Sequence, residues 1–284
     1  MGLVANGAKL DSRAAIKRAL ALIARDGRTA AMQAENARQV GVKCPVFPTA
    51  AALAQHCDLL LVFGGDGTML RAVRESNGAQ TPILGINVGR LGFLTAVSSN
   101  DLAAALQKIW DNDFTVEPVF LLEAAVATRD KPLKVWALND IAISHGAVSR
   151  IIELEVSVGG ESLTRYRGDG LIVSSPAGST AYSLSAGGPI VSPGADVFAI
   201  TPICPHTLSN RSVIVSMKAT VDVKVLSRGM EIIVAADGQV EATVGAGDAI
   251  TIRRTRRAVN LLHLGGWSFF DTVRRKLHWS GSAV

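Results

Sequence analysis

The hydrophobic pattern of this 284-residue chain changes near residue 98, and this change limits the possible folds more than any other feature. Before it, apolar runs alternate with a helical pattern. Residues 59–63 and 83–86 are such runs, and residues 69–75 between them have helical composition. A run that is apolar on both faces is typical of a parallel strand covered by helices. This order of elements predicts a small doubly wound α/β domain with a parallel sheet.

After one more helical pattern that begins near Asn100, the hydrophobic period drops to two from Phe114 onward. Residues 152–158 and 221–225 carry isoleucine, leucine or valine at every second position. Such alternation is typical of half-exposed, mostly antiparallel strands. Residues 267–279 then return to helical spacing. We therefore expect an α/β domain at residues 1–98 and a β-rich domain at residues 99–265, followed by a helical tail.

Short polar residues and glycines mark several expected helix ends. Ser12, Thr49 and Asn100 precede helical patterns and offer side-chain oxygens to the free N–H groups of a first turn. Gly27 follows the first of these patterns and suits the left-handed conformation in which many helices end. The sequence thus predicts helices that begin after Ser12, Thr49 and Asn100.

Composition excludes several classes of protein. Apolar residues make up 48% of the chain and charged residues 19%, which fits a folded core and not a disordered chain. The run at 59–63 is far shorter than the ~20 residues of a membrane-spanning helix. A net charge of +5 and an aromatic content of 5% do not favour a nucleic-acid protein. The arginine-rich run at 253–257 is the local exception, and a solvated strand end or turn is the favoured interpretation.

The cysteines and the N-terminus bear on the compartment. Cys44, Cys57 and Cys204 are odd in number and show no paired spacing, which fits a reducing cytoplasm. The first six residues lack a charged leader with an apolar stretch. We therefore expect a cytoplasmic protein that does not enter a membrane.

A glycine-rich turn follows the first apolar run directly. It consists of Gly64, Gly65, Asp66, Gly67 and Thr68. The glycines allow a sharp turn with exposed N–H groups, and such donors beside a helix N-terminus suit a phosphate. An aspartate is unfavourable beside a bare phosphate, so we expect Asp66 to meet a metal, a hydroxyl or a proton. A tight turn without further function is the alternative.

Polar residues also gather in the β-rich half. Asn139 and Asp140 interrupt an apolar segment, where they need partners. The segment 174–188 is rich in small and hydroxyl residues and could hold a sugar or an adenine edge, although an ordinary surface loop is the alternative. Ser179 lacks the G-x-S-x-G setting of a nucleophile. The histidines show no metal-ligand spacing, so no structural zinc is predicted.

Together these residues resemble the NAD kinase family, enzymes that phosphorylate NAD to NADP. The Gly-Gly-Asp-Gly element is shared with diacylglycerol, sphingosine and phosphofructo-kinases, whereas residues 178–182 together with the Asn-Asp pair separate this family from them. The resemblance extends over nearly the whole chain, through residues 64–70, 85–94, 139–140, 168–188, 201–209, 237–239 and the tail.

The resemblance implies an overall arrangement and a set of ligands. The α/β domain would comprise residues 1–98 with the tail, 266–284, which returns to it, and residues 99–265 would form a β-sandwich-like domain. NAD would lie between the domains. ATP with a divalent metal, usually Mg²⁺, would supply the phosphoryl group, although some relatives accept inorganic polyphosphate. No protein ligand of the metal can be assigned, and the subunits would form dimers or tetramers.

The resemblance also implies roles for individual residues. Asp66 would be the catalytic carboxylate that accepts the proton of the adenosine ribose 2′-hydroxyl, and Gly64, Gly65, Gly67 and Thr68 would face the phosphates. Further positions would contact NAD: Asp66, Gly67, Arg71, Asn139, Asp140, Arg150, Arg167, Asp169, Ala177, Thr180, Ala181, Tyr182, Ser183, Leu184, Ser185 and Gln239.

Two positions depart from the family pattern. Many relatives carry threonine at the position of Ala177 and glutamate at that of Asp140, so the affinity for substrate could differ from theirs. Two other functions stay open at this level. One is a lipid or sugar kinase with the same glycine-rich turn, and the other is a sensor that binds NAD or NADP without turnover.

Overall fold

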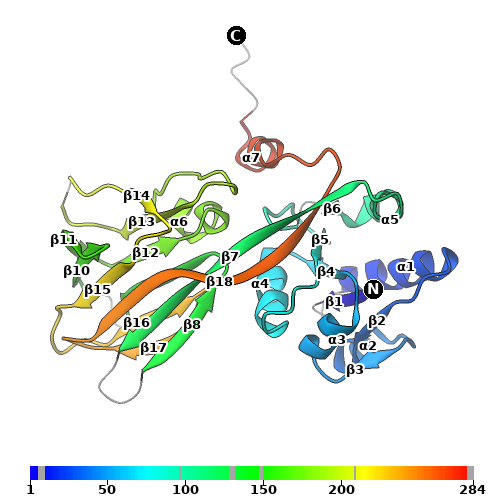
Figure 1. The fold of residues 1–284 in the computed structure, drawn as a ribbon, viewed down its shortest axis with the longest axis horizontal. Coiled ribbons are helices and arrows are strands. Elements are labelled where there is room, and N and C mark those ends of the chain that lie inside the picture. Colours follow the sequence, from blue (N-terminus) through cyan, green and yellow to red (C-terminus); the bar gives the residue numbers. More distant parts are fainter. Residues whose placement is uncertain (6–9, 96, 128–131, 147–149, 208, 280–284) are drawn as a thin grey trace, which may run out of the picture. The chain divides into compact units, whose positions relative to one another are not determined.

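The computed structural model describes residues 1–5, 10–95, 97–127, 132–146, 150–207 and 209–279 (Figure 1). The chain forms two compact units, residues 1–119 with 258–284 and residues 120–257. These limits differ from the sequence-based ranges because helix α5 (Leu102–Trp110) and the start of strand β7 (Phe114–Ala127) pack into the core of the first unit.

The first unit contains the predicted parallel sheet. Its five-stranded part has the order β5-β4-β1-β2-β3, and each neighbouring pair is parallel. Strand β6 (Val97–Ser98) and the last part of β18 (Ala249–Leu264) join β5. The five strands are β1 (Gly2–Ala5), β2 (Ala31–Gln33), β3 (Val46–Phe47), β4 (Leu60–Gly64) and β5 (Ile83–Asn87).

Helices cover both faces of this sheet. Leu61 and Phe63 of β4 share one core with apolar residues of α1, α2 and α5, whereas α3 contacts β1 and α4 contacts β4. The sheet is therefore buried on both sides, as the apolar run predicts. The helices of the unit are α1 (Leu10–Arg25), α2 (Ala34–Val40), α3 (Ala50–His56), α4 (Asp66–Glu75), α5 and α7 (Phe269–Leu277), with a 3₁₀ turn at Ser99–Asp101.

The structure confirms one of the three predicted helix caps and contradicts the other two. The Thr49 hydroxyl accepts from the N–H of Ala52 at 3.1 Å, so this cap is confirmed. Helix α1 begins at Leu10, so Ser12 lies inside the helix and its prediction as a cap is wrong. The Asn100 prediction is also wrong, because Ser98 accepts the N–H of Asn100 and a 3₁₀ turn precedes α5. Gly27 adopts φ +68° just beyond α1, as expected.

The second unit is built of antiparallel strands. One sheet has the order β14-β13-β12-β9-β16-β17, and in the other β11, β10, β15 and β18 are neighbours, with β7 joined to β18 and β8. The strands are β8 (Leu133–Ala137), β9 (Asp140–His145), β10 (Ile152–Val158), β11 (Glu161–Gly168), β12 (Gly170–Ser174), β13 (Val197–Ile203), β14 (Val213–Ser216), β15 (Val221–Val225), β16 (Ile232–Ala236) and β17 (Gln239–Val244), with β7 and β18.

The two sheets of this unit share one apolar core. Leu122 of β7, Val223 of β15 and Ile252 of β18 meet Ile143 of β9 and Val173 of β12, and all five side chains are fully buried. The alternating pattern of the sequence therefore produces the expected β-sandwich-like domain. Two short helical segments, a 3₁₀ turn at Ala177–Thr180 and helix α6 (Tyr182–Ser185), follow β12.

Candidate active site

The glycine-rich turn connects β4 to α4, as the sequence predicts. Strand β4 ends at Gly64, Gly65 stands at the N-cap position, and Asp66 is the first residue of α4. A Cβ on Gly64 would lie 2.2 Å from the Thr68 hydroxyl, so only glycine fits there. Because Gly65 has no side chain, no side-chain cap covers the first-turn N–H groups. This helix end therefore keeps donors and a positive dipole end for an anion.

The carboxylate of Asp66 is held by the loop that follows β5. Its Oδ2 accepts the N–H of Phe93 at 2.9 Å, and its Oδ1 accepts the N–H of Leu94 at 3.0 Å and the Thr95 hydroxyl at 3.3 Å. A Cβ on Gly92 would lie 2.0 Å from Oδ1. The resemblance includes this segment, but Thr95 lies just outside it and has no sequence signal of its own.

Arg71 lies one turn further along α4. Its guanidinium donates to the carbonyl of Ala5, at the end of β1, at 2.8 Å and lies 3.8 Å from the carboxylate of Glu75. Arg71 therefore belongs to the same edge of the sheet as Asp66, where the parallel strands end. Its contact with the phosphates of a dinucleotide stays a prediction.

In the second unit, Asp237 fixes the backbone of the predicted Asn-Asp pair. Its carboxylate accepts the N–H groups of Leu138 at 2.9 Å, Asn139 at 2.7 Å and Asp140 at 3.3 Å. Asp237 has φ +49° in the turn between β16 and β17 and donates its own N–H to the carbonyl of Asp140. The sequence analysis did not place Asp237 in the site, although the resemblance includes it, because only the fold joins these distant residues.

Asn139 and Asp140 are both buried, and both are unusual polar groups. Asp140 is 4% exposed; its burial, with the nearby charge of Asp237 as a second cause, raises the pKa of its carboxyl from 3.8 to about 7. The Oδ1 atom of Asn139 is buried and has no hydrogen-bond partner among the described residues. A buried polar atom without a partner is costly, so a ligand that supplies one would be favoured here.

The loop rich in small residues packs directly on this pair. Ser175 donates its N–H to the carbonyl of Asn139 at 2.8 Å and its hydroxyl to that of Leu138 at 2.7 Å. A Cβ on Gly178 would lie 2.0 Å from the carbonyl oxygen of Asn139. The start of this loop, at Ser175 and Gly178, therefore lies against the backbone of Leu138 and Asn139.

The serines of this loop serve its structure. The Ser179 hydroxyl is buried; it donates to the carbonyl of Pro176 at 2.7 Å and accepts the N–H of Val191 at 3.0 Å. Ser183 is buried and exchanges a hydrogen bond with Thr201 at 3.0 Å. These bonds give both hydroxyls a structural role within the second unit. The Thr180 hydroxyl donates to the carbonyl of Ala177 at 3.2 Å, and Ala181, Leu184 and Ser185 complete the segment.

Tyr182 provides an exposed aromatic face at this site. Its side chain is 45% exposed. Burial raises the pKa of its phenol, and the charges of Cys204, Asp140 and Asp169 raise it further, so these three groups lie near it. A hydrogen bond to Asp169 raises the pKa of the Cys204 thiol. The charges of Asp140 and Asp169 therefore act on the Tyr182 phenol.

Three further predicted NAD contacts are exposed residues of the second unit. Arg150 and Arg167 are exposed, and so is Gln239 at the start of β17. Within the described ranges, no hydrogen bond or ion pair joins their side chains to Asn139, Asp140 or Asp169. Their contact with NAD stays a prediction.

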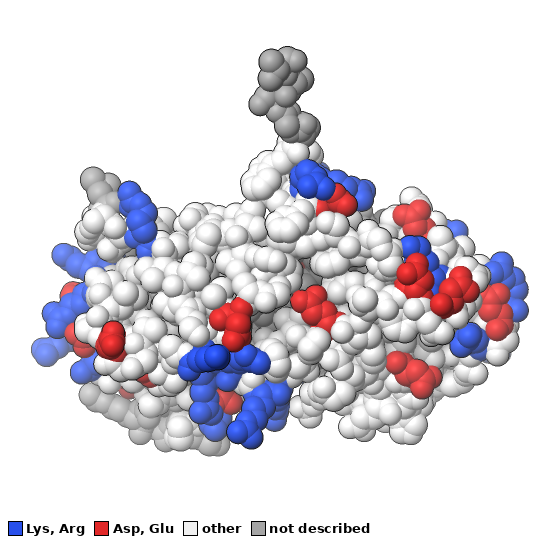
Figure 2. Space-filling view, turned by 45° about the horizontal axis from the view of Figure 1, so that its top comes forward, with Lys and Arg blue, Asp and Glu red and all other residues white. Residues whose placement is uncertain are grey.

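The arginine-rich run at 253–257 lies inside strand β18, so its interpretation as a strand end or turn is wrong. Two of its arginines have acidic partners within the second unit. Arg253 donates twice to the carboxylate of Glu123, at 2.6 and 2.9 Å, and Arg254 pairs with Asp196 at 2.7 Å. On the face shown in Figure 2, charged atoms form separate groups between wide uncharged areas, and the group at the lower middle is mostly basic. Acidic side chains therefore neutralise part of this run.

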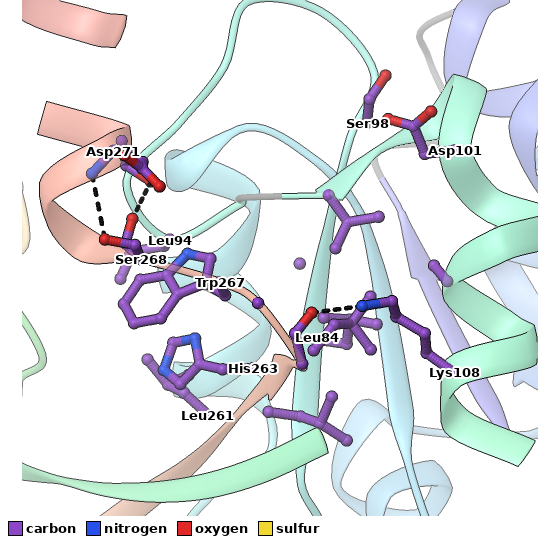
Figure 3. Close-up of a pocket in the computed structure, with 18 of the residues that line it drawn as sticks. Leu84, Leu94, Ser98, Asp101, Lys108, Leu261, His263, Trp267, Ser268 and Asp271 are labelled. Atoms are coloured by element: carbon purple, nitrogen blue, oxygen red, sulfur yellow. Dashed lines mark hydrogen bonds between the residues drawn. The ribbon is translucent and has the colours of Figure 1, made fainter. Parts of the chain in front are cut away.

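A cavity of about 320 Å³ lies in the first unit, next to the loop that holds Asp66 (Figure 3). Phe93 and Leu94 line it, together with α5, the end of β18 and α7. Figure 3 shows His263 beside Trp267 on one wall, and their rings stack at 3.9 Å. Burial lowers the pKa of His263, while Glu117, 3.2 Å away, opposes this effect.

Comparisons with known proteins identify the family. The model of the ATP-NAD kinase N-terminal domain matches residues 14–114, and that of the C-terminal domain matches residues 138–264. The NAD kinase of Syntrophotalea carbinolica is 43% identical over 223 residues, 78% of each chain. That of Polaromonas sp. is 38% identical over 272 residues, 95% of this chain and 92% of the relative. This chain belongs to the NAD kinase family.

Solved structures of this NAD kinase family have the same fold. Yeast NADH kinase, crystallised with NADH, matches with a TM-score of 0.89 and 25% identity over 100% of this chain and 88% of its own. The Archaeoglobus fulgidus NAD kinase, in complex with ATP, matches with a TM-score of 0.78 and 28% identity over 99% of each chain. The predicted family, two-domain fold and kinase activity are thereby confirmed.

Proposed function

We propose that this NAD kinase transfers the γ-phosphoryl group of ATP to the 2′-hydroxyl of the adenosine ribose of NAD, which gives NADP and ADP. The observation that carries this proposal is the position of Asp66. Its carboxylate is the first acidic group of an uncapped helix and is fixed by the N–H groups of Phe93 and Leu94. A carboxylate fixed beside free backbone donors combines a proton acceptor with a phosphate cradle.

The reaction needs alignment and charge neutralisation more than covalent catalysis, because the transition state of phosphoryl transfer is loose. The 2′-oxygen forms a bond to the γ-phosphorus while the bond to the oxygen bridging to ADP breaks. The 2′-hydroxyl proton passes to the Asp66 carboxylate, and such a general base contributes ~10²–10⁴-fold. The N–H groups at the start of α4, around Gly65 and Gly67, neutralise charge on the phosphoryl oxygens.

Residues of the second unit would bind NAD. The Oδ1 atom of Asn139 lacks a partner in the described part of the chain, and a ribose hydroxyl of NAD would supply one. Asp140 can also hydrogen-bond a ribose hydroxyl, and the exposed ring of Tyr182 offers a face for a base. The structure of yeast NADH kinase with NADH supports this class of ligand.

The residues present fit a Mg²⁺ ion that arrives with the nucleotide. Among the described residues, no group of three or more His, Cys, Asp or Glu could hold a metal. Mg²⁺ commonly keeps several waters and binds largely through substrate phosphates, so the phosphates of the bound nucleotide would supply its ligands. Bound there, the ion would neutralise charge on the phosphates.

A coupled assay tests the function: protein, ATP, Mg²⁺ and NAD, with NADP detected by a strictly NADP-dependent dehydrogenase. We expect NADP from the wild type and a fall in turnover of ~10²-fold or more for Asp66→Asn. The control is Asp271→Asn, which changes a carboxylate in the first turn of another helix, α7. Near-normal turnover of Asp66→Asn would remove the base from the mechanism.

The same assay separates other donors and acceptors. If NAD binds by calorimetry but no NADP forms with ATP, polyphosphate is the next donor to test. Failure with both would favour a sensor that binds NAD(P) without turnover. Diacylglycerol and fructose 6-phosphate, tested beside NAD, address a lipid or sugar kinase.

We also propose a cytoplasmic homodimer or homotetramer that acts without nucleic acid or membrane. All three cysteines, Cys44, Cys57 and Cys204, are free thiols, which fits a reducing compartment. None of the helices among the described residues is long and apolar enough to cross a membrane. Light scattering coupled to gel filtration would give the number of subunits, and a monomer would contradict the proposal.

A further inference from the structure

Thr95 holds Asp66 through a side-chain contact that the turn itself does not provide. Two of the three hydrogen bonds to the carboxylate come from the backbone N–H groups of Phe93 and Leu94. The third comes from the Thr95 hydroxyl, 3.3 Å from Oδ1. Thr95 is fully buried. A side-chain donor can be removed by substitution without change to the backbone, so its contribution can be measured separately.

Asn87 determines the direction of this hydrogen bond. The Oδ1 atom of Asn87 accepts the N–H of Gly89 at 2.9 Å. This bond decides which end of the amide is oxygen and which is the donor nitrogen, Nδ2. Nδ2 donates to the carbonyl of Arg90 at 2.6 Å and to the Thr95 hydroxyl at 3.2 Å. A hydroxyl has one proton. Because Asn87 donates to the hydroxyl oxygen, the Thr95 proton is directed to Asp66.

The space around the carboxylate permits little adjustment. Gly92 passes so close that a Cβ there would lie 2.0 Å from Oδ1 of Asp66 and 2.3 Å from the Thr95 hydroxyl. Asn87 is 5% exposed, so its amide is fixed by protein partners. The carboxylate is therefore confined by backbone on one side and oriented by a chain of donors that begins on strand β5.

We infer that Thr95, oriented by Asn87, is a positioning residue that fixes the rotamer of Asp66 for proton transfer from the acceptor hydroxyl. The inference rests on the proposed function and deepens it. Thr95 need not touch NAD, so its loss should lower the rate of the chemical step and leave the binding of NAD nearly intact.

The test compares three variants in the coupled assay. Thr95→Val keeps the shape and removes the donor, and we expect kcat to fall about tenfold, as for one lost hydrogen bond, while KM for NAD changes less than about twofold. Thr95→Ser keeps the donor and should restore kcat to within about threefold of the wild type. Thr81→Val is the matched control, because the Thr81 hydroxyl donates to the carbonyl of Ala54 at 2.5 Å at the other end of β5.

Urea unfolding accompanies each assay. If Thr95→Val does not fold, Thr95→Cys replaces the hydroxyl with a weaker donor, and a kcat between those of wild type and Asp66→Asn is expected. Wild-type kcat in a folded Thr95→Val protein, with Asp66→Asn inactive, overturns this inference and leaves the proposed function standing. Absence of NADP from the wild type overturns the proposed function itself. Equal losses of kcat in Thr95→Val and Thr95→Ser would show a packing role without positioning.

Discussion

Asp140 should make the stability of the protein depend on pH in a direction opposite to that of most aspartates. Its carboxyl is buried beside Asp237, and its pKa is raised from 3.8 to about 7. The folded protein therefore prefers the neutral carboxyl, whereas the unfolded chain ionises it above pH 4. As the pH rises through this window, ionisation favours the unfolded chain, so the free energy of unfolding falls. Above about pH 7 both states are ionised and the loss is complete.

The size of the effect follows from the width of the window. Each pH unit between the two pKa values costs about 1.4 kcal/mol. Between pH 5.5 and the folded pKa, the carboxyl therefore costs the protein about 2 kcal/mol of unfolding free energy. Asp140→Asn carries a neutral amide at every pH and avoids this cost. The stability of the variant relative to the wild type should thus increase by about 2 kcal/mol from pH 5.5 to 8.5.

Urea unfolding without nucleotide measures this difference at both pH values. Groups that do not interact with Asp140 titrate equally in both proteins, so their effects cancel in the comparison. Asp196→Asn, with an aspartate whose side chain is 49% exposed, shows what the same change does outside the core. If the difference in unfolding free energy between Asp140→Asn and the wild type were the same at both pH values, a neutral Asp140 in the folded protein would be refuted. If the stability of Asp140→Asn relative to the wild type decreased toward pH 8.5, the pKa of Asp140 in the folded protein would be lowered and not raised.

Two further predictions concern packing in the second unit. Gly178→Ala places a Cβ 2.0 Å from the carbonyl of Asn139. This substitution should lower the free energy of unfolding by about 1–3 kcal/mol and weaken NAD binding in calorimetry. Gly194→Ala is the control, because a Cβ there has no atom within 4 Å and should change neither quantity. Glu123→Gln should cost about 1 kcal/mol in urea unfolding, because it weakens the charged hydrogen bonds to the half-exposed Arg253. Unchanged stability in either Gly178→Ala or Glu123→Gln would contradict the corresponding contact.

Local patterns in the sequence predicted the elements better than their ends. The run at 59–63 identified β4 because apolar residues on both faces need cover on both sides. Ser12, Thr49 and Asn100 are short polar residues at the start of helical patterns, yet of these three only Thr49 caps a helix. Whether a residue caps a helix depends on the backbone that leads into the helix. A serine inside the first turn, such as Ser12, therefore looks the same in the sequence as a serine at the cap position.

The contacts that hold the candidate site could not be predicted, because they join residues far apart in the chain. Asp66 binds donors 27 to 29 residues later, and Asp237 binds N–H groups 97 to 99 residues earlier. No local period or motif records such a pairing. The resemblance supplied the positions of Asp66, Asn139 and Asp140, but only the fold shows what orients them.

The two aspartates perform the same physical task in the two units. Asp66 accepts the successive N–H groups of Phe93 and Leu94, and Asp237 accepts those of Leu138, Asn139 and Asp140. A carboxylate that binds adjacent N–H groups fixes a loop more rigidly than a neutral side chain, because each bond is charge-assisted. The difference lies in the charge that results. Asp66 is proposed to use its own carboxylate as the base, whereas Asp237 orients its neighbours and, through its charge, helps to keep Asp140 neutral. Asp237→Asn should therefore weaken NAD binding and lower the pKa of Asp140 together, and a variant that changes only one of them would show that these two effects of Asp237 are separable.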